Sequence, residues 1–313
     1  MTEPRDHADD PAGESPGDAA GRRPPLLSVR ELRVHFPVRT GLLQRAGEPF
    51  RAVDGVSFDL PPGKTLGLVG ESGSGKTTVG RAILGLVRTT SGRVLFDGRE
   101  IDQPHIDRTH LHRHWLHRHW LHRHWLDRTK RIRAFRRDMQ IVFQDPAGAL
   151  NPRLSVRSIL AEPICVHRLA KPGELDARIA SLLDRCGLPA SAADRYPHEF
   201  SGGQRQRLVI ARALATSPRF LVCDEPTSAL DVSIQSQIIN LLRELQSDLG
   251  LTYLFISHDM AVVRHMCDDI AVMHKGKIVE QGPNERVLRN PEHPYTQTLI
   301  AAVPTTSARA KTA

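Results

Sequence analysis

The sequence lacks any long hydrophobic run. No stretch of it approaches the roughly eighteen consecutive apolar residues of a membrane-spanning helix. The N-terminal residues also lack the apolar core of a secretory signal peptide, so we expect this chain to stay in the cytoplasm. We therefore do not expect it to move a solute across a bilayer by itself.

Paired cysteines are absent as well. The four cysteines are scattered and form no C-x-x-C pair: Cys165, Cys186, Cys223 and Cys267. This spacing argues against a disulfide framework and against a zinc ribbon, so we expect reduced thiols. Hydrophobic residues make up 40% of the chain, enough for a globular protein of one large domain or two. The formal net charge of +8 is weak evidence for an anionic partner, because much of the excess is local to residues 110–137.

A glycine-rich loop follows the apolar residues 65–69 and precedes a predicted helix. Such a loop turns backbone N–H groups toward an anion, and the positive end of the helix dipole adds to the attraction. Lys76 is then placed to reach the β- and γ-phosphates of a nucleotide, and Thr77 to hold Mg²⁺. A glycine-rich turn without function is the less favoured alternative. The expected loop consists of Gly70, Glu71, Ser72, Gly73, Ser74, Gly75, Lys76, Thr77 and Thr78.

The remaining chain alternates between predicted strands and helices. Residues 1 to about 25 have almost nothing to bury and are predicted to be a disordered tail. Apolar periodicity predicts strands at 28–36, 53–60, 93–98, 139–143, 220–226 and 251–257, and a hairpin at 270–280 that closes the sheet. The helix after the loop is expected to end near residue 91, and helical patterns follow at 155–188 and 205–215.

Polar side chains follow three of these strands. Asp224 and Glu225 end a buried strand, as a Mg²⁺-dependent phosphate site requires: Asp224 for the metal and Glu225 to polarise an attacking water. Gln144 and His258 end two further strands, where a glutamine can ligate Mg²⁺ and a lone histidine is more often structural. A second anion site is suggested by Ser201-Gly202-Gly203-Gln204 at a helix N-terminus, although this motif is also a common turn.

A pentad, Leu-His-Arg-His-Trp, occurs three times in succession over residues 111–125. A five-residue step turns a helix by about 140° and changes faces in a strand, so the three tryptophans share no face. We interpret the tract as an expanded repeat in a surface connection rather than as a metal site, despite its His-x-His pairs. The basic run 128–137 that follows is interpreted as a solvated face, with phosphate or lipid contact as the alternative.

Taken in order, these motifs resemble the nucleotide-binding subunit of an ATP-binding cassette transporter. The resemblance runs from about Leu27 to Pro304 and includes Ser228 to Asp231. It implies an α/β fold: a P-loop NTPase core with a mostly parallel sheet, an antiparallel β edge and an inserted helical subdomain. It further implies that Phe36 stacks on adenine, that Glu225 is the general base, and that His258 senses the γ-phosphate.

The resemblance also implies a head-to-tail dimer. In that family, ATP on the phosphate loop of one subunit is covered by the Ser-Gly-Gly-Gln motif of another. The implied ligands are ATP and Mg²⁺, the latter held by Thr77, Gln144 and Asp224. The implied domains are an ATPase domain at 26–285, with a helical subdomain at about 146–204 and a repeat insertion at about 105–128, and a C-terminal extension at 286–313.

Two stretches narrow the resemblance to the ATPases of oligopeptide, dipeptide and nickel importers. These are Phe143 to Pro146 continuing to Arg153, and Asn290 to Thr296 continuing to Pro304. Residues 52–58 and 196–200 are more similar to the second of the two paired ATPases in such systems. The implied partners are two transmembrane permease subunits, a paralogous ATPase with a homodimer as fallback, and indirectly a solute-binding protein. The implied location is peripheral, on the cytoplasmic face of the cell membrane.

Two departures from this family stand out: the pentad repeat replaces a short connection, and the chain stops soon after Pro304. Many relatives continue into a cysteine-bearing tail, so no iron–sulfur or regulatory role of that tail is carried over. The resemblance implies an ATPase that couples Mg-ATP binding and hydrolysis to uptake of oligopeptides or dipeptides, and import of nickel or another small solute is the alternative. Two other classes also remain open. A soluble cassette ATPase acting on nucleic acid is disfavoured because no large inserted DNA-binding element is evident. A non-catalytic interaction subunit is disfavoured by the presence of Glu225 and His258.

Overall fold

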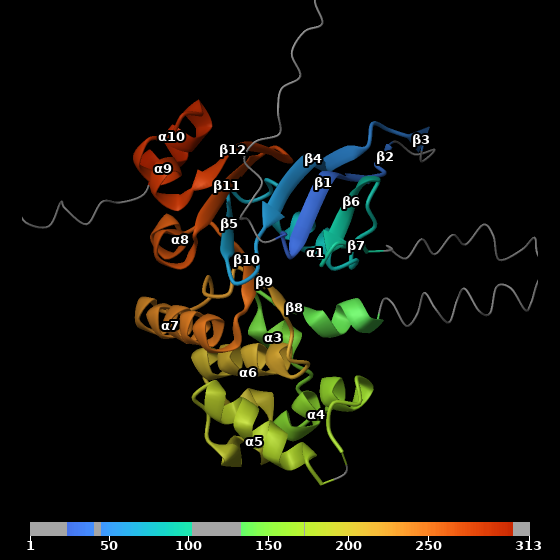
Figure 1. Cartoon of the computed structure of the whole chain (residues 1–313), viewed down its shortest axis with the longest axis vertical. Coiled ribbons are helices and arrows are strands. Elements are labelled where there is room, and N and C mark those ends of the chain that lie inside the picture. Colours follow the sequence, from blue (N-terminus) through green and yellow to red (C-terminus); the bar gives the residue numbers. More distant parts are fainter. Residues whose placement is uncertain (1–23, 41–44, 102–132, 172, 303–313) are drawn as a thin grey trace, which may run out of the picture.

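The computed structural model describes residues 24–40, 45–101, 133–171 and 173–302 of the chain. Its described part contains two larger sheets with a helix between them, a group of helices at the far end and C-terminal helices beside the main sheet (Figure 1). The pentad repeat at 111–125 lies outside these residues, and so does the predicted N-terminal tail except for residues 24 and 25. The predicted domain boundaries therefore stay predictions.

The main sheet has six strands in the order β12-β11-β5-β10-β9-β8. Strands β8, β9, β10, β5 and β11 are parallel, and β12 is antiparallel to β11. Every residue of β5, β9 and β10 is buried, as expected for central strands covered on both faces. The strands are β5 (Thr65–Val69), β8 (Met139–Val142), β9 (Phe220–Asp224), β10 (Thr252–Ser257), β11 (Asp269–His274) and β12 (Lys277–Pro283).

The predicted hairpin at the sheet edge is confirmed. Strands β11 and β12 are joined by Lys275 and Gly276, with φ angles of 46° and 82°. Two consecutive positive φ angles give the turn whose twist matches that of paired antiparallel strands. Strand β12 is the antiparallel edge of the main sheet.

The N-terminal strands form a sheet of their own rather than part of that edge. Its order is β4-β1-β6-β7, all antiparallel, and a separate short pair joins β2 to β3. Helix α1 (Lys76–Ile83) lies between this sheet and the main one, because its buried residues share one core with both. The strands are β1 (Leu27–Phe36), β2 (Arg39–Thr40), β3 (Arg45–Ala46), β4 (Phe50–Leu60), β6 (Ser91–Phe96) and β7 (Arg99–Glu100).

Helix α1 is shorter than the sequence analysis predicted: it ends at Ile83 instead of near residue 91. Gly85 adopts a left-handed φ of 65°. Its N–H donates to the Ala82 carbonyl at 3.0 Å, and the Leu86 N–H donates to the Arg81 carbonyl at 2.8 Å. This pair of bonds is a Schellman motif, which satisfies the last carbonyl groups of a helix and terminates it.

The other face of the main sheet is covered by helices that share a second core. Helices α6 and α7 lie nearest the strands, and α4 and α5 lie farther out at the end opposite the antiparallel sheet (Figure 1). These helices are α3 (Pro146–Ala149), α4 (Val156–Val166), α5 (Leu175–Arg185), η2 (Ala190–Asp194), η3 (Pro197–Glu199), α6 (Gly202–Leu214) and α7 (Val232–Leu249).

Three C-terminal helices complete this part of the molecule: α9 packs against β11 and β12, α8 packs against β5 and β10, and α10 lies beside α9 (Figure 1). They are α8 (Met260–Met266), α9 (Asn284–Arg289) and α10 (Pro294–Ala301). Across the described ranges, none of the helices combines the length and the apolar character that crossing a bilayer demands.

Candidate nucleotide site

The phosphate loop is built by glycines at positions where another residue would clash. Gly70 has a φ of 148° and Gly75 a φ of 105°. A Cβ atom at Gly70 would meet the Met273 carbonyl oxygen at 2.2 Å, and one at Gly75 would meet the Ala52 carbonyl oxygen at 2.2 Å. Gly75 is also the N-cap of α1 and supplies no side-chain cap, so the first N–H groups of the helix face the loop without a side-chain acceptor. This is the backbone arrangement that binds an anion.

Lys76 is buried at the centre of the loop, with 5% of its surface exposed. Its Nζ donates to the carbonyl oxygens of Gly70 at 2.7 Å and Glu71 at 2.8 Å. Burial lowers the pKa of Lys76, and the nearby carboxylates of Glu225 and Asp224 oppose that shift. An anion bound in the loop would supply the ammonium with a further counter-charge.

Asp224, the last residue of β9, faces the first turn of α1. Its carboxylate accepts a hydrogen bond from the Thr77 hydroxyl at 2.8 Å. Burial raises the pKa of Asp224, while the Thr77 bond and the charge of Arg81 act in the opposite direction. A buried carboxylate beside a hydroxyl oxygen is a donor set that fits Mg²⁺.

Within the described residues no three or more His, Cys, Asp or Glu side chains are grouped to hold a metal ion. Mg²⁺ in phosphate-transferring proteins is commonly held by one or two carboxylates together with the phosphates of the nucleotide. Thr77 and Asp224 match that requirement, and the Gln144 amide lies in the same cavity.

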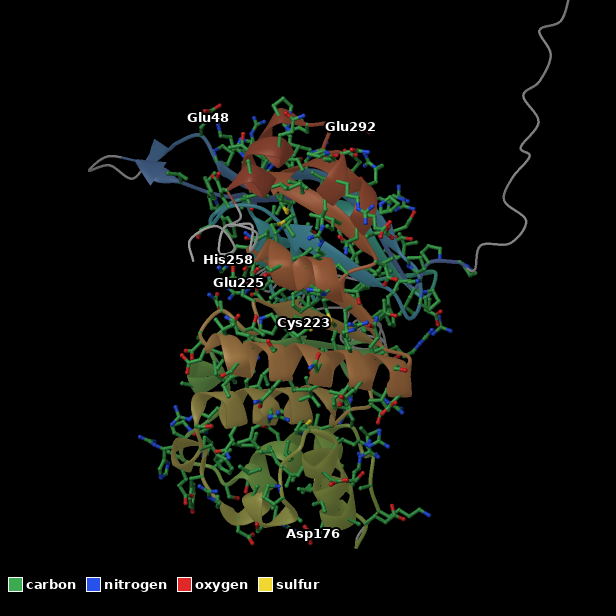
Figure 2. The ribbon with its side chains drawn as sticks, turned by 90° about the vertical axis from the view of Figure 1, so that its left-hand side faces the viewer. Glu48, Asp176, Cys223, Glu225, His258 and Glu292 are labelled. Atoms are coloured by element: carbon green, nitrogen blue, oxygen red, sulfur yellow. The ribbon has the colours of Figure 1, made fainter. Side chains whose placement is uncertain are left out.

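Glu225 has a strained backbone, with a φ of 46°, directly after β9. Its N–H donates to the Ile256 carbonyl at 3.0 Å, which ties it to the neighbouring strand β10. The Glu225 carboxylate accepts a hydrogen bond from the Gln144 amide at 3.1 Å and lies 3.3 Å from Nδ1 of His258. Figure 2 shows Glu225 and His258 next to each other. Strain of this kind recurs at active sites, where it fixes the direction of a side chain.

A cavity of about 530 Å³ joins these groups. Because the carboxyl ends of parallel strands meet at one edge of a sheet, residues 70–78, 144, 225 and 258 come together although they are far apart in sequence. The cavity is lined by Phe50, Ala52, Ser72, Gly73, Gly75, Lys76, Thr77, Thr78, Gln144, Glu225 and His258. Of the predicted loop residues, Gly70, Glu71 and Ser74 do not line the cavity, and Asp224 adjoins it through Thr77.

The aromatic residue that lines this cavity is Phe50, which the sequence analysis did not identify. Phe36, which it did identify, is the register partner of Phe50 across β1 and β4 and does not line the cavity. Both are exposed, Phe36 at 40% and Phe50 at 58%, so neither is a core residue. The signal in the sequence was an aromatic three residues before the predicted strand at 53–60, which extends back to Phe50 in the structure.

The Ser201-Gly202-Gly203-Gln204 motif forms the start of α6 and does not line the cavity. The Ser201 hydroxyl accepts from the Gln204 N–H at 3.3 Å, and the Gln204 side chain accepts from the Ser201 N–H at 3.1 Å. A Cβ atom at Gly203 would meet Ile234 of α7 at 2.6 Å, so only glycine allows this packing. Asp231, the N-cap of α7, makes no side-chain cap bond and also lies outside the cavity.

The fold and the cavity define a nucleotide-binding protein with a phosphate loop. A family model described as "ABC transporter" matches residues 53–228, more than half of the chain, so the chain belongs to that family. A second model, "Oligopeptide/dipeptide transporter, C-terminal region", matches residues 279–313.

Among the relatives is the glutathione import ATP-binding protein GsiA of Shigella boydii serotype 4, which is 51% identical over 280 residues. GsiA of Escherichia coli K12 is 50% identical over the same length. Each match covers 90% of this chain and 41% of the relative, so the chain spans about two fifths of the length of these curated proteins.

Solved structures give the same fold. CbiO1 from Clostridium perfringens, part of the ABC transporter complex cbiONQ, has a TM-score of 0.67 and 28% identity, covering 86% of this chain and 92% of CbiO1. The ATP-binding cassette MJ0796, in a dimeric post-hydrolysis state with ADP and Pi, has a TM-score of 0.65 and 26% identity, covering 82% of this chain and 98% of MJ0796.

Proposed function

We propose that this chain is the ATP-hydrolysing subunit of an importer that couples Mg-ATP binding and hydrolysis to uptake of oligopeptides or dipeptides. The observation that carries the proposal is the contact of Glu225 with both Gln144 and His258 inside the cavity of the phosphate loop. The match of residues 279–313 to the C-terminal region of oligopeptide and dipeptide transporters supports the substrate class.

Hydrolysis requires a water activated next to the γ-phosphate. Glu225 accepts a proton from that water as the water attacks phosphorus, and ADP is the leaving group. Gln144 and His258 orient the Glu225 carboxylate through their side-chain nitrogens. His258, whose side chain is 60% exposed, is free to turn toward a γ-phosphate oxygen.

Lys76 and the N–H groups of the loop would bind the phosphates of the nucleotide, and Thr77, Asp224 and Gln144 would hold Mg²⁺. The ion would neutralise charge between the β- and γ-phosphates. For the adenine ring, the exposed Phe50 is better placed to stack than Phe36, because Phe50 lines the cavity.

The chain acts as a head-to-tail dimer. Ser201, Gly202, Gly203, Gln204 and Asp231 would complete the site of a partner subunit, since none of them lines the cavity of its own chain. The dimeric state of MJ0796 supports this arrangement. The partner is a paralogous ATPase subunit, with a second copy of this chain as the alternative.

A second cavity is the surface that we assign to a membrane partner. It has a volume of about 490 Å³ and lies between α1, β8 and α4, where Phe135 and Phe143 are among its lining residues. Leu86 and Val166 on its rim are about half exposed, at 50% and 49%. We assign this groove to a cytoplasmic segment of a permease subunit, because Phe143 directly precedes Gln144 and so connects the groove to the nucleotide site. Two permease subunits would hold the dimer peripherally on the cytoplasmic face of the cell membrane, with the solute-binding protein in indirect contact.

The solute class is tested by transport. The chain, its permeases and its paralogous ATPase are reconstituted in proteoliposomes with MgATP and the solute-binding protein, and uptake of labelled dipeptide, oligopeptide, glutathione and Ni²⁺ is compared. ATP-dependent uptake of a peptide is expected. Uptake of Ni²⁺ alone would favour the alternative solute, and absence of ATP hydrolysis would reject the enzymatic role.

A further inference from the structure

The C-terminal helix α10 reaches the phosphate loop. The hydroxyl of Tyr295 lies 3.0 Å from the backbone nitrogen of Glu71 and accepts its N–H, although the two residues are 224 positions apart. Figure 1 shows α10 beside α9, on the side of the molecule where β11 and β12 lie. Tyr295 belongs to the C-terminal segment, and none of the proposed catalytic roles involves it.

Helix α10 is fixed in place by Glu280 of β12. The Glu280 carboxylate, with 4% of its side chain exposed, accepts the N–H groups of Glu292 at 3.1 Å and His293 at 3.0 Å. Burial opposes ionisation of this carboxyl, but the two N–H donors and Arg286 hold the pKa of Glu280 below its ordinary value. His293 caps α10 by accepting the Tyr295 N–H at 3.1 Å. The backbone that presents Tyr295 is therefore anchored at the start of the helix.

The Tyr295 ring is held as well. Its centroid lies 4.0 Å from that of His274, the last residue of β11. The turn that follows His274 donates the Gly276 N–H to the Ser74 carbonyl at 3.0 Å. The phosphate loop is thus contacted at Ser74 by the β11–β12 turn and at Glu71 by α10.

The peptide group between Gly70 and Glu71 connects Tyr295 to Lys76. Its N–H donates to Tyr295, and its carbonyl oxygen accepts the Lys76 ammonium at 2.7 Å. A peptide group is planar, so rotation that breaks one of these bonds also displaces the other. Because Gly70 has no Cβ, rotation about its Cα–C bond meets little steric resistance from a side chain. The Tyr295 bond opposes it.

We propose that Tyr295 is a positioning residue for nucleotide binding: it fixes the Gly70–Glu71 peptide so that Lys76 is held in the loop, and it makes nucleotide affinity depend on docking of the C-terminal extension. The inference rests on the proposed function only in taking Mg-ATP as the ligand of the loop. By linkage, bound nucleotide strengthens the docking of α10 by the same factor.

Tyr295→Phe tests this inference, because it removes the acceptor oxygen and keeps the ring against His274. The Kd for Mg-ATP, measured by calorimetry on the full chain, is expected to rise about threefold to tenfold, the range for loss of one hydrogen bond. The kcat for hydrolysis should change less than about twofold, since Glu225 and its partners are untouched. Hydrogen exchange at the Glu71 amide of the nucleotide-free chain should accelerate, while exchange in β5 stays unchanged.

The matched control is Tyr253→Phe. The Tyr253 hydroxyl is buried and donates to the Leu242 carbonyl at 2.9 Å, so this variant loses a tyrosine hydrogen bond elsewhere in the core. It is expected to lower the melting temperature and leave the Kd for Mg-ATP unchanged. Glu280→Gln weakens the anchor of α10, and its effect on Kd should not add to that of Tyr295→Phe.

The two proposals fail in different ways. If the unaltered chain does not bind Mg-ATP, or Lys76→Ala binds it equally well, the proposed function is wrong. If binding depends on Lys76 but Tyr295→Phe leaves either the Kd or the Glu71 exchange rate unchanged, the positioning role of Tyr295 is wrong and the proposed function stands.

Discussion

Replacing Lys76 by alanine and Glu225 by glutamine should separate ATP binding from ATP hydrolysis. The Lys76 ammonium is buried, with 5% exposure, and lies within hydrogen-bond distance of two loop carbonyls. A charge-assisted hydrogen bond contributes about 1.5–3 kcal/mol, and about 1.4 kcal/mol corresponds to tenfold in affinity. Lys76→Ala should therefore weaken Mg-ATP binding roughly tenfold to a hundredfold.

Glu225→Gln should act on the rate instead. Glutamine has the same shape and keeps an oxygen that accepts from Gln144, whose amide lies 3.1 Å from the carboxylate. It does not accept a proton from water, and loss of a general base costs about 10²–10⁴ in rate. The phosphate cradle is unchanged, so the Kd for Mg-ATP should stay within about twofold of that of the unaltered chain.

Calorimetry with Mg-ATP and a phosphate-release assay measure the two effects on the same preparations. Glu244→Gln, the same substitution at an exposed position of α7, is the matched control and should leave both quantities unchanged. An equal loss of ATP affinity in Lys76→Ala and Glu225→Gln would refute the roles assigned to them.

Three further predictions concern the dimer, the repeat and pH. Ser201→Arg puts bulk at the start of α6, so it should spare nucleotide binding to the isolated chain and abolish ATP-dependent association. Light scattering in a Glu225→Gln background measures that association, and undiminished association would exclude a role of Ser201 in the nucleotide site of a partner subunit. Excision of residues 110–126 should leave ATPase activity nearly unchanged, because loop length affects stability only logarithmically. A decrease in melting temperature of more than about 5 °C would reject the interpretation of the repeat as a surface connection. The pKa of Glu280 lies below its usual 4.5 in the folded chain, so the stability it contributes is present above pH 4.5 and is lost as the pH falls through the folded value. The difference in melting temperature between the unaltered chain and Glu280→Gln should accordingly shrink below pH 4.5, and a difference that grows there would contradict this sign.

Much of the candidate site was predictable because its signals are local. The glycines of the loop, the buried strand before Asp224 and Glu225, and the strand before His258 are each contained in fewer than ten residues. The end of α1 was also within reach, since Gly85 is a C-terminal helix signal. The apolar pattern continues past that glycine to Val87, so periodicity alone predicts a longer helix than the one that forms.

What the sequence by itself determined is the strands of the main sheet and the order of the motifs, since backbone preference and apolar periodicity act over a few residues; it did not indicate the helices α7 to α10. Only the tertiary structure decided which residues share a cavity or a hydrogen bond. Pairing of β1 with β4 brought Phe50 rather than Phe36 to the cavity, and docking of α10 brought Tyr295 to Glu71. The first of these pairings joins residues that are 14 positions apart in the sequence, and the second joins residues that are 224 positions apart. Such contacts depend on sheet order, register and helix packing, and no short stretch of sequence contains that information.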